Sequence, residues 1–100
     1  MKRIFKYSLQ IIAHQEILTH RYSQILDVQV QNGRPHIWLV VDEDEPTETV
    51  VISIFGTGQE IPKDFYINNG SNNYAGTFQL DDYVWHVFAS GHFTSHQLAP

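Results

Sequence analysis

Residues 24–42 read QILDVQVQNGRPHIWLVVD, two apolar-rich stretches on either side of Asn32-Gly33. Asn-Gly is the dipeptide that most readily takes the positive φ angles of a two-residue type I′ turn. Before the turn, apolar and polar residues alternate from Leu26 to Gln31, which predicts a strand with Leu26 on its buried face. After the turn, residues 37–41 are apolar at every position, which predicts a strand in the middle of a sheet. The stretch therefore predicts a β-hairpin as the nucleus of a β-rich fold.

The rest of the chain reads as short strands joined by turns. Further strands are predicted at 4–12, 16–19, 49–55, 74–80 and 83–89. A short helix is the alternative between 13 and 24, where the apolar residues fit neither period cleanly. Six or seven strands with at most one short helix predict an all-β fold, either a small antiparallel sandwich or a small barrel.

The predicted connections are polar. Asp42–Glu48 is an acidic turn interrupted by Pro46, and residues 68–73 form an asparagine-rich stretch that is expected to be a mobile loop. A single β-rich domain is predicted over 1–90, followed by a flexible tail over 91–100.

Composition excludes several classes of function. The 100 residues contain no cysteine, so disulfides and thiolate metal sites are absent. The net charge of −5 leaves no basic stripe for duplex DNA. No apolar run is long enough to span a membrane, and Lys6, Ser8 and Gln10 break up any signal-peptide core, so neither membrane insertion nor export is expected.

The six histidines do not predict a metal site. Only His92 and His96 have a recognisable spacing, and a catalytic zinc site usually needs three protein ligands. We therefore expect no metal and no cofactor. His86, which alternates with apolar residues on the last predicted strand, is the best functional histidine, although a histidine held by a backbone partner is the simpler interpretation. No Gly-x-Ser-x-Gly elbow marks a nucleophile, and no catalytic residue is assigned.

Candidate binding residues fall into three chemical groups. Aromatic side chains could contact a protein or stack on a nucleobase, although they could equally fill the sandwich interior. Cations and glycine-loop amides could hold phosphate, although glycines at a strand end are commonly there for the turn itself. The candidates are Trp38, Tyr66, Tyr74 and Trp85 for the aromatics, Arg34 and Lys63 for the cations, and Gly56, Thr57 and Gly58 for the amides, with His86 beside them.

A run of acids could face a basic partner, or it could be a solvated turn whose charges protect a sheet edge. These residues are Asp42, Glu43, Asp44, Glu45 and Glu48.

Several segments, taken in order, resemble a family of uncharacterised proteins of roughly a hundred residues found widely in bacteriophages and prophages. They include residues 25–33, the Gly-Thr-Gly-x-x-Ile-Pro segment at 56–62, Gly-Thr-Phe-Gln at 76–79 and His-Val-Phe at 86–88. The resemblance spans residues 4–88 and implies a phage-borne protein acting in the cytoplasm of an infected bacterium. It implies no catalytic residues.

In that setting, the sequence predicts a non-enzymatic accessory protein that inhibits a host process such as anti-phage defence. It would either cover a host protein or, as a homo-oligomer with a dimer favoured, sequester a nucleotide signal. The alternatives are a small hydrolase using His86 with Asp81 or Asp82, and a virion structural or assembly protein.

Overall fold

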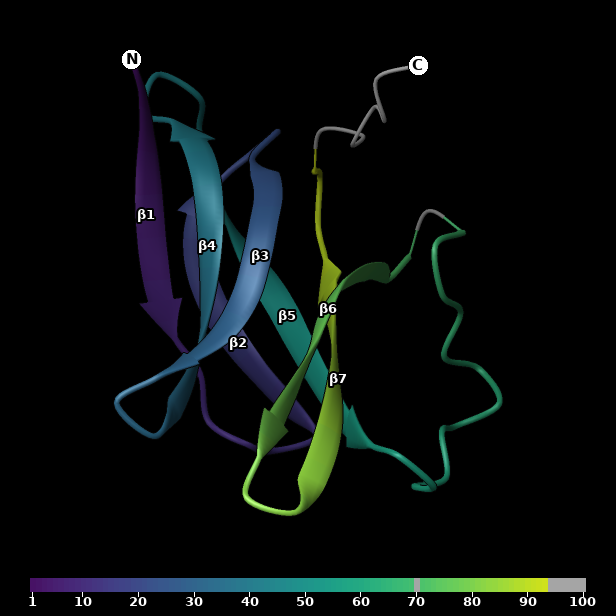
Figure 1. Ribbon diagram of the computed structural model, residues 1–100. Coiled ribbons are helices and arrows are strands. Elements are labelled where there is room, and N and C mark those ends of the chain that lie inside the picture. The colour runs from purple at the N-terminus through teal and green to yellow at the C-terminus, as the bar shows by residue number, and fades with distance from the viewer. Residues whose placement is uncertain (70, 94–100) are drawn as a thin grey trace, which may run out of the picture.

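The computed structural model describes residues 1–69 and 71–93, which form a sandwich of two antiparallel sheets (Figure 1). The all-β prediction is confirmed, and the described residues contain no helix. The segment for which a short helix was the alternative is instead a full strand, longer than the predicted 16–19. The strands are β1 (Lys2–Ser8), β2 (His14–His20), β3 (Gln24–Gln31), β4 (Arg34–Asp42), β5 (Thr47–Gly56), β6 (Asn73–Leu80) and β7 (Tyr83–Ser90).

The hairpin of β3 and β4 forms as its sequence predicts. Asn32 and Gly33 both have positive φ angles, 54° and 74°, as a type I′ turn requires. The first sheet has the order β1-β4-β3, so β4, whose residues 37–41 are all apolar, is central as predicted. The second sheet has the order β2-β5-β7-β6; in Figure 1 its strands β2 and β5 lie behind the first sheet, and β6 and β7 stand at the lower right.

The core fills the space between the two sheets. From β4 it takes Ile37, Leu39 and Val41, each fully buried, while the alternate residues of that strand point outward. From β5 it takes Val50, Ile52 and Ile54, the face that the alternation of this strand predicts. Burying these aliphatic side chains is the main favourable contribution to folding, worth roughly 1.5–3 kcal/mol for each.

The prediction that Leu26 lies on the buried face is wrong. The pairing of β3 with β4 shifts between Ile25 and Asp27, which makes Leu26 the extra residue of a β-bulge. Ile25 takes the inward position opposite Leu39, and Leu26 is left 46% exposed. Alternation resumes after the bulge, so Val28 is buried as predicted.

The second sheet is covered on its outer face as well. The long connection between β5 and β6, at the right of Figure 1, places Phe65 against Phe55 and Phe88, with ring centroids 5.1 Å and 5.5 Å apart. This explains why Phe55 is buried although it points away from the sandwich interior. The asparagine-rich end of the connection is bonded both within itself and to β7, because Asn72 Nδ2 donates to the carbonyl of Tyr66 at 2.9 Å and Asn73 Nδ2 donates to the carbonyl of Ala89 at 3.1 Å.

Residues 91–93 continue past β7 and contact the body of the sandwich. The backbone N–H of His92 donates to Glu48 at 2.8 Å, and Phe93 packs against the core next to a bridge with Ser23. The rest of the predicted tail, 94–100, lies outside the described residues, and with it His96.

Candidate functional site

A shallow hollow of about 290 Å³ opens where β5 ends and β7 begins. Part of its lining is aromatic: Tyr83 and Trp85 have ring centroids 6.2 Å apart at an interplanar angle of 45°. Tyr83 is 67% exposed, so most of its ring is open to a partner. The hollow is lined by Gly56, Thr57, Asp82, Tyr83, Val84 and Trp85.

Local sequence features position this aromatic part of the lining. The β6–β7 turn at Asp81-Asp82, where Asp81 has a φ angle of 57°, makes Tyr83 the first residue of β7. Gly56 pairs with Trp85, and a Cβ at Gly56 would lie 3.2 Å from Cζ3 of the indole. Glycine therefore lets the Trp85 ring lie against the backbone of β5.

The ladder between β5 and β7 continues one residue past the end of β5. The N–H of Thr57 donates to the carbonyl of Val84 at 3.0 Å, and the N–H of Gly56 donates to Gln59 Oε1 at 2.9 Å. These bonds close the Gly-Thr-Gly turn, in which Gly58 has a φ angle of 87°. The Thr57 amide is thus engaged by β7 and the Gly56 amide by the turn, so neither of these two candidate amides points toward a phosphate.

His86 lies beside the hollow, on the outer face of β7. Its Nε2 is 2.8 Å from Thr57 Oγ1 and its Nδ1 is 3.1 Å from Thr77 Oγ1, which in turn bonds the hydroxyl of Tyr74. Each ring nitrogen is thus engaged by a neutral hydroxyl. Within residues 1–69 and 71–93, no carboxylate forms a hydrogen bond or ion pair with His86, so the acid–base pair with Asp81 or Asp82 is not assembled. The network fixes Thr57 at the rim of the hollow.

The structure gathers some predicted site residues and separates others. Gly56, Thr57 and Trp85 line the hollow, and His86 and Tyr74 join it through the hydroxyl network. Arg34 and Trp38 lie on β4, in the other sheet, while Lys63 and Tyr66 lie in the β5–β6 connection. The two predicted phosphate-binding cations are therefore on different parts of the molecule, and neither lines the hollow.

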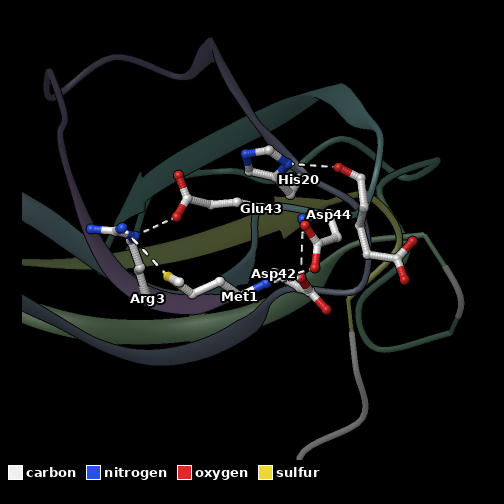
Figure 2. Close-up of polar contacts among 7 residues, drawn as sticks. Met1, Arg3, His20, Asp42, Glu43 and Asp44 are labelled. Atoms are coloured by element: carbon white, nitrogen blue, oxygen red, sulfur yellow. Dashed lines mark hydrogen bonds and ion pairs between the residues drawn. The ribbon is translucent and has the colours of Figure 1, made fainter.

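The acidic run is occupied by contacts within the chain (Figure 2). The amino group of Met1 donates to Asp44 Oδ2 at 2.7 Å and to Asp42 Oδ1 at 3.2 Å, and Arg3 forms an ion pair with Glu43. The backbone N–H of Asp44 and the Met1 ammonium hold the pKa of Asp42 below its ordinary value. The same carboxylates, Asp44 first, raise the pKa of the Met1 amino group. His20 Nδ1 lies 2.7 Å from the carbonyl of Glu45.

These contacts follow from strand order. Antiparallel pairing of β1 with β4 sets Lys2 opposite Asp42, which brings the basic start of β1 against the acidic end of β4. The run is thus partly neutralised, which weakens it as a surface for a basic partner. Exposed ion pairs of this kind contribute little to stability. In the sequence, these contacts are indicated only by the opposite charges of the start of β1 and the acidic run at 42–48.

Glu48 is the best-anchored acid of the run, with a side chain 19% exposed. It accepts from the backbone N–H and from Nδ1 of His92, both at 2.8 Å, and Arg21 Nε lies 3.9 Å away. Burial acts to raise the pKa of Glu48, but the hydrogen bonds from His92 and the charges of His92 and Arg21 outweigh it. The pKa of Glu48 therefore lies below its ordinary value of 4.5.

Replacing Glu48 by glutamine is expected to lower the free energy of unfolding by about 1–2 kcal/mol at pH 7, because a charged hydrogen-bond acceptor is lost. A carboxylate with a lowered folded-state pKa stabilises the fold above its ordinary pKa, and this contribution is lost as the pH falls through the folded-state value. Urea unfolding at pH 7 and at pH 3 measures the difference. Glu16→Gln, at an exposed position on β2, is the control. A loss of unfolding free energy in Glu48→Gln that is the same at pH 7 and pH 3 would contradict the prediction.

Among the described residues, no three histidine, aspartate or glutamate side chains are grouped so that they could hold a metal ion. The same residues contain no helix long and apolar enough to cross a membrane.

The fold and the hollow define a small antiparallel β-sandwich protein with an exposed aromatic site at one end of its second sheet. The chain belongs to the family described as "Domain of unknown function (DUF7352)", whose model matches residues 1–97. No curated protein and no solved structure matches it.

Proposed function

We propose that this protein is a non-enzymatic accessory protein that binds a host protein through the hollow and thereby inhibits a host process, with anti-phage defence as the target class. The observation that carries the proposal is the composition of the hollow. Tyr83 and Trp85 present aromatic surface next to Asp82, and within residues 1–69 and 71–93 no lysine or arginine lines the site.

This chemistry suits a basic side chain of a protein partner. Tyrosine and tryptophan are the residues most often found to dominate binding energy at protein interfaces. A lysine or arginine placed over an aromatic ring gains a cation–π interaction, and Asp82 would add the opposite charge. In this proposal the basic partner contacts Asp82 in the β6–β7 turn, and not the acidic run at 42–48.

The other functions considered from the sequence have less support. Sequestering a nucleotide calls for cations close to the aromatic surface, whereas Arg34 and Lys63 lie elsewhere. Hydrolysis by His86 with Asp81 or Asp82 calls for a carboxylate beside the imidazole, whereas the ring nitrogens of His86 contact the hydroxyls of Thr57 and Thr77. The phage and host setting rests on the resemblance of residues 4–88 to phage proteins.

The test compares two exposed tyrosines. Tyr83→Ala removes the aromatic rim of the hollow, and Tyr66→Ala removes a ring that is 58% exposed in the β5–β6 connection. Wild type and Tyr66→Ala are expected to capture the same host protein from a bacterial lysate, and Tyr83→Ala is expected to bind that purified protein at least about 30-fold more weakly. Equal binding by both variants would place the partner surface elsewhere.

Native mass spectrometry with linear and cyclic nucleotides separates the remaining functions. We expect no stoichiometric adduct and no altered nucleotide. A stoichiometric, unaltered adduct would replace the proposal with nucleotide sequestration, and a chemically changed nucleotide would replace it with an enzyme. Finding the protein in purified phage particles would favour a virion role.

A further inference from the structure

The outer face of the β1-β4-β3 sheet is open. Among the described residues, the long connection that covers the other sheet packs against Phe55 and Phe88 of β5 and β7. The first sheet instead exposes large apolar side chains, with Ile4 63% and Leu26 46% accessible. Half-buried Trp38 and Val40 lie between them on β4. We call this surface the open face.

The pairing of the strands arranges the open face in rows. The central row runs from Lys6 on β1 through Trp38 on β4 to Asp27 on β3. The next row runs from Ile4 through Val40 to Gln24, and the bulge residue Leu26 lies on β3 between the two rows. A tryptophan is thus flanked by one positive and one negative side chain, on opposite edge strands.

Both charges are exposed and are bonded only to neutral groups, including the backbone N–H of Val28, which donates to Asp27 Oδ1 at 2.8 Å. Lys6 Nζ donates to Gln31 Oε1 at 2.7 Å, and Asp27 Oδ2 accepts from Gln29 Nε2, also at 2.7 Å. Both are contacts with neutral side chains of β3, and both charged residues are exposed. Neither charge is therefore already committed to an ion pair in the described part of the chain.

A two-fold axis can set the Lys6–Trp38–Asp27 row of one copy against the same row of a second copy so that opposite charges meet. Two copies packed face to face can be related by a two-fold axis that runs along β4 or across it. With the axis along β4, the β1 strand of each copy lies over the β3 strand of the other, and Lys6 meets Asp27 of the partner subunit. Ile4 then lies over the part of β3 that contains Leu26 of the partner subunit. With the axis across β4, each strand lies over its own copy and like charges meet.

We propose that the open face binds a second copy of this chain, in a face-to-face dimer whose two-fold axis runs along β4. Trp38 of the two subunits meet at the axis, flanked by two Lys6–Asp27 pairs. Three strands about 4.8 Å apart and about 23 Å long cover roughly 330 Å² per subunit, well below the roughly 800 Å² per partner of a standard specific interface. The dimer is therefore reversible and forms at high micromolar protein concentration.

The second sheet faces away from this interface, so the dimer presents two hollows to solvent. A target with two binding positions would then be held by both subunits, which raises the effective affinity without any new contact. The dimer does not depend on the function proposed for the hollow, and either can fail without the other.

Charge reversal tests the dimer. Wild type, Lys6→Glu and Asp27→Lys are examined by sedimentation equilibrium at about 10–500 μM and low salt, where the Debye length is long. Wild type is expected to dimerise. Each variant alone sets like charges against each other and is expected to dimerise at least about 10-fold more weakly. An equimolar mixture of the two variants restores opposite charges at both pairs and is expected to form the heterodimer.

The matched control is Lys63→Glu, a charge reversal in the β5–β6 connection, which is expected to dimerise like wild type. Near-UV circular dichroism verifies that each variant is folded. A wild type that stays monomeric at 500 μM would overturn the proposal and leave the open face to a different partner. Variants that dimerise like wild type, or a mixture that does not recover, would overturn it as well.

Discussion

Replacing Leu39 by alanine is expected to lower the free energy of unfolding by about 3–5 kcal/mol. Leu39 is fully buried in the central strand of the first sheet, where it pairs with Phe5 on β1 and Ile25 on β3. Removing its side chain loses the transfer free energy of three carbons and leaves a cavity that two paired sheets cannot easily close. Urea unfolding followed by circular dichroism at pH 7 measures the effect.

Trp38→Ala is the matched control, because it removes a larger side chain at the neighbouring position. Trp38 points out of the sandwich and is half-buried beside His36, with ring centroids 5.7 Å apart. Its replacement is expected to cost less than half as much as Leu39→Ala when measured at about 1 μM, where any dimer has dissociated. An equal or larger cost for Trp38→Ala would show that the two faces of β4 have been assigned the wrong way round.

Local patterns explain why much of the fold can be predicted from the sequence. The Asn32-Gly33 turn and the alternation around it fix the β3–β4 hairpin, since turn type and register are properties of adjacent residues. The apolar run of β4 identifies a central strand, and the alternation of β5 identifies its inner face, Val50, Ile52 and Ile54. Each of these predictions depends on residues within about ten positions of one another.

The parts that could not be predicted depend on distant pairings. A bulge is a single extra residue and leaves no mark on composition, so Leu26 was assigned to the wrong face. Phe65 stands in a polar connection, and only the fold brings it over Phe55 and Phe88. The acidic run meets Met1 and Arg3 because β1 pairs with β4, which the sequence order does not specify.

The same distinction applies to the candidate site. Gly56, Thr57, Trp85 and His86 were singled out by residue type, and the pairing of β5 with β7 brings them together. Tyr83 and Asp82 were missed as binding residues because nothing in the sequence shows which strand lies beside the start of β7. The predicted cations, Arg34 and Lys63, fail to join the site for the same reason.

Gly76→Val is expected to lower the free energy of unfolding by about 2–3 kcal/mol, because it overpacks the place where the two sheets meet. A Cβ at Gly76 would lie 3.1 Å from Cβ and 3.3 Å from Cγ2 of Val28, closer than such atoms normally approach. Gly76 follows a register shift in β6 and lies directly against Val28 of β3. Thermal unfolding of the variant measures the cost.

A double-mutant cycle with Val28→Ala shows whether the cost comes from this contact. Val28→Ala alone is expected to be destabilising, because Val28 is buried. In the double variant, however, the smaller side chain at position 28 makes room for part of the added valine. The two costs are therefore expected to sum to more than the cost of the double variant, by about 1 kcal/mol. Strict additivity would mean that the cost comes from the positive φ angle of Gly76, 158°, which strains any side chain there, and not from the contact with Val28. The contact between β3 and β6 would then not be what excludes a side chain at Gly76.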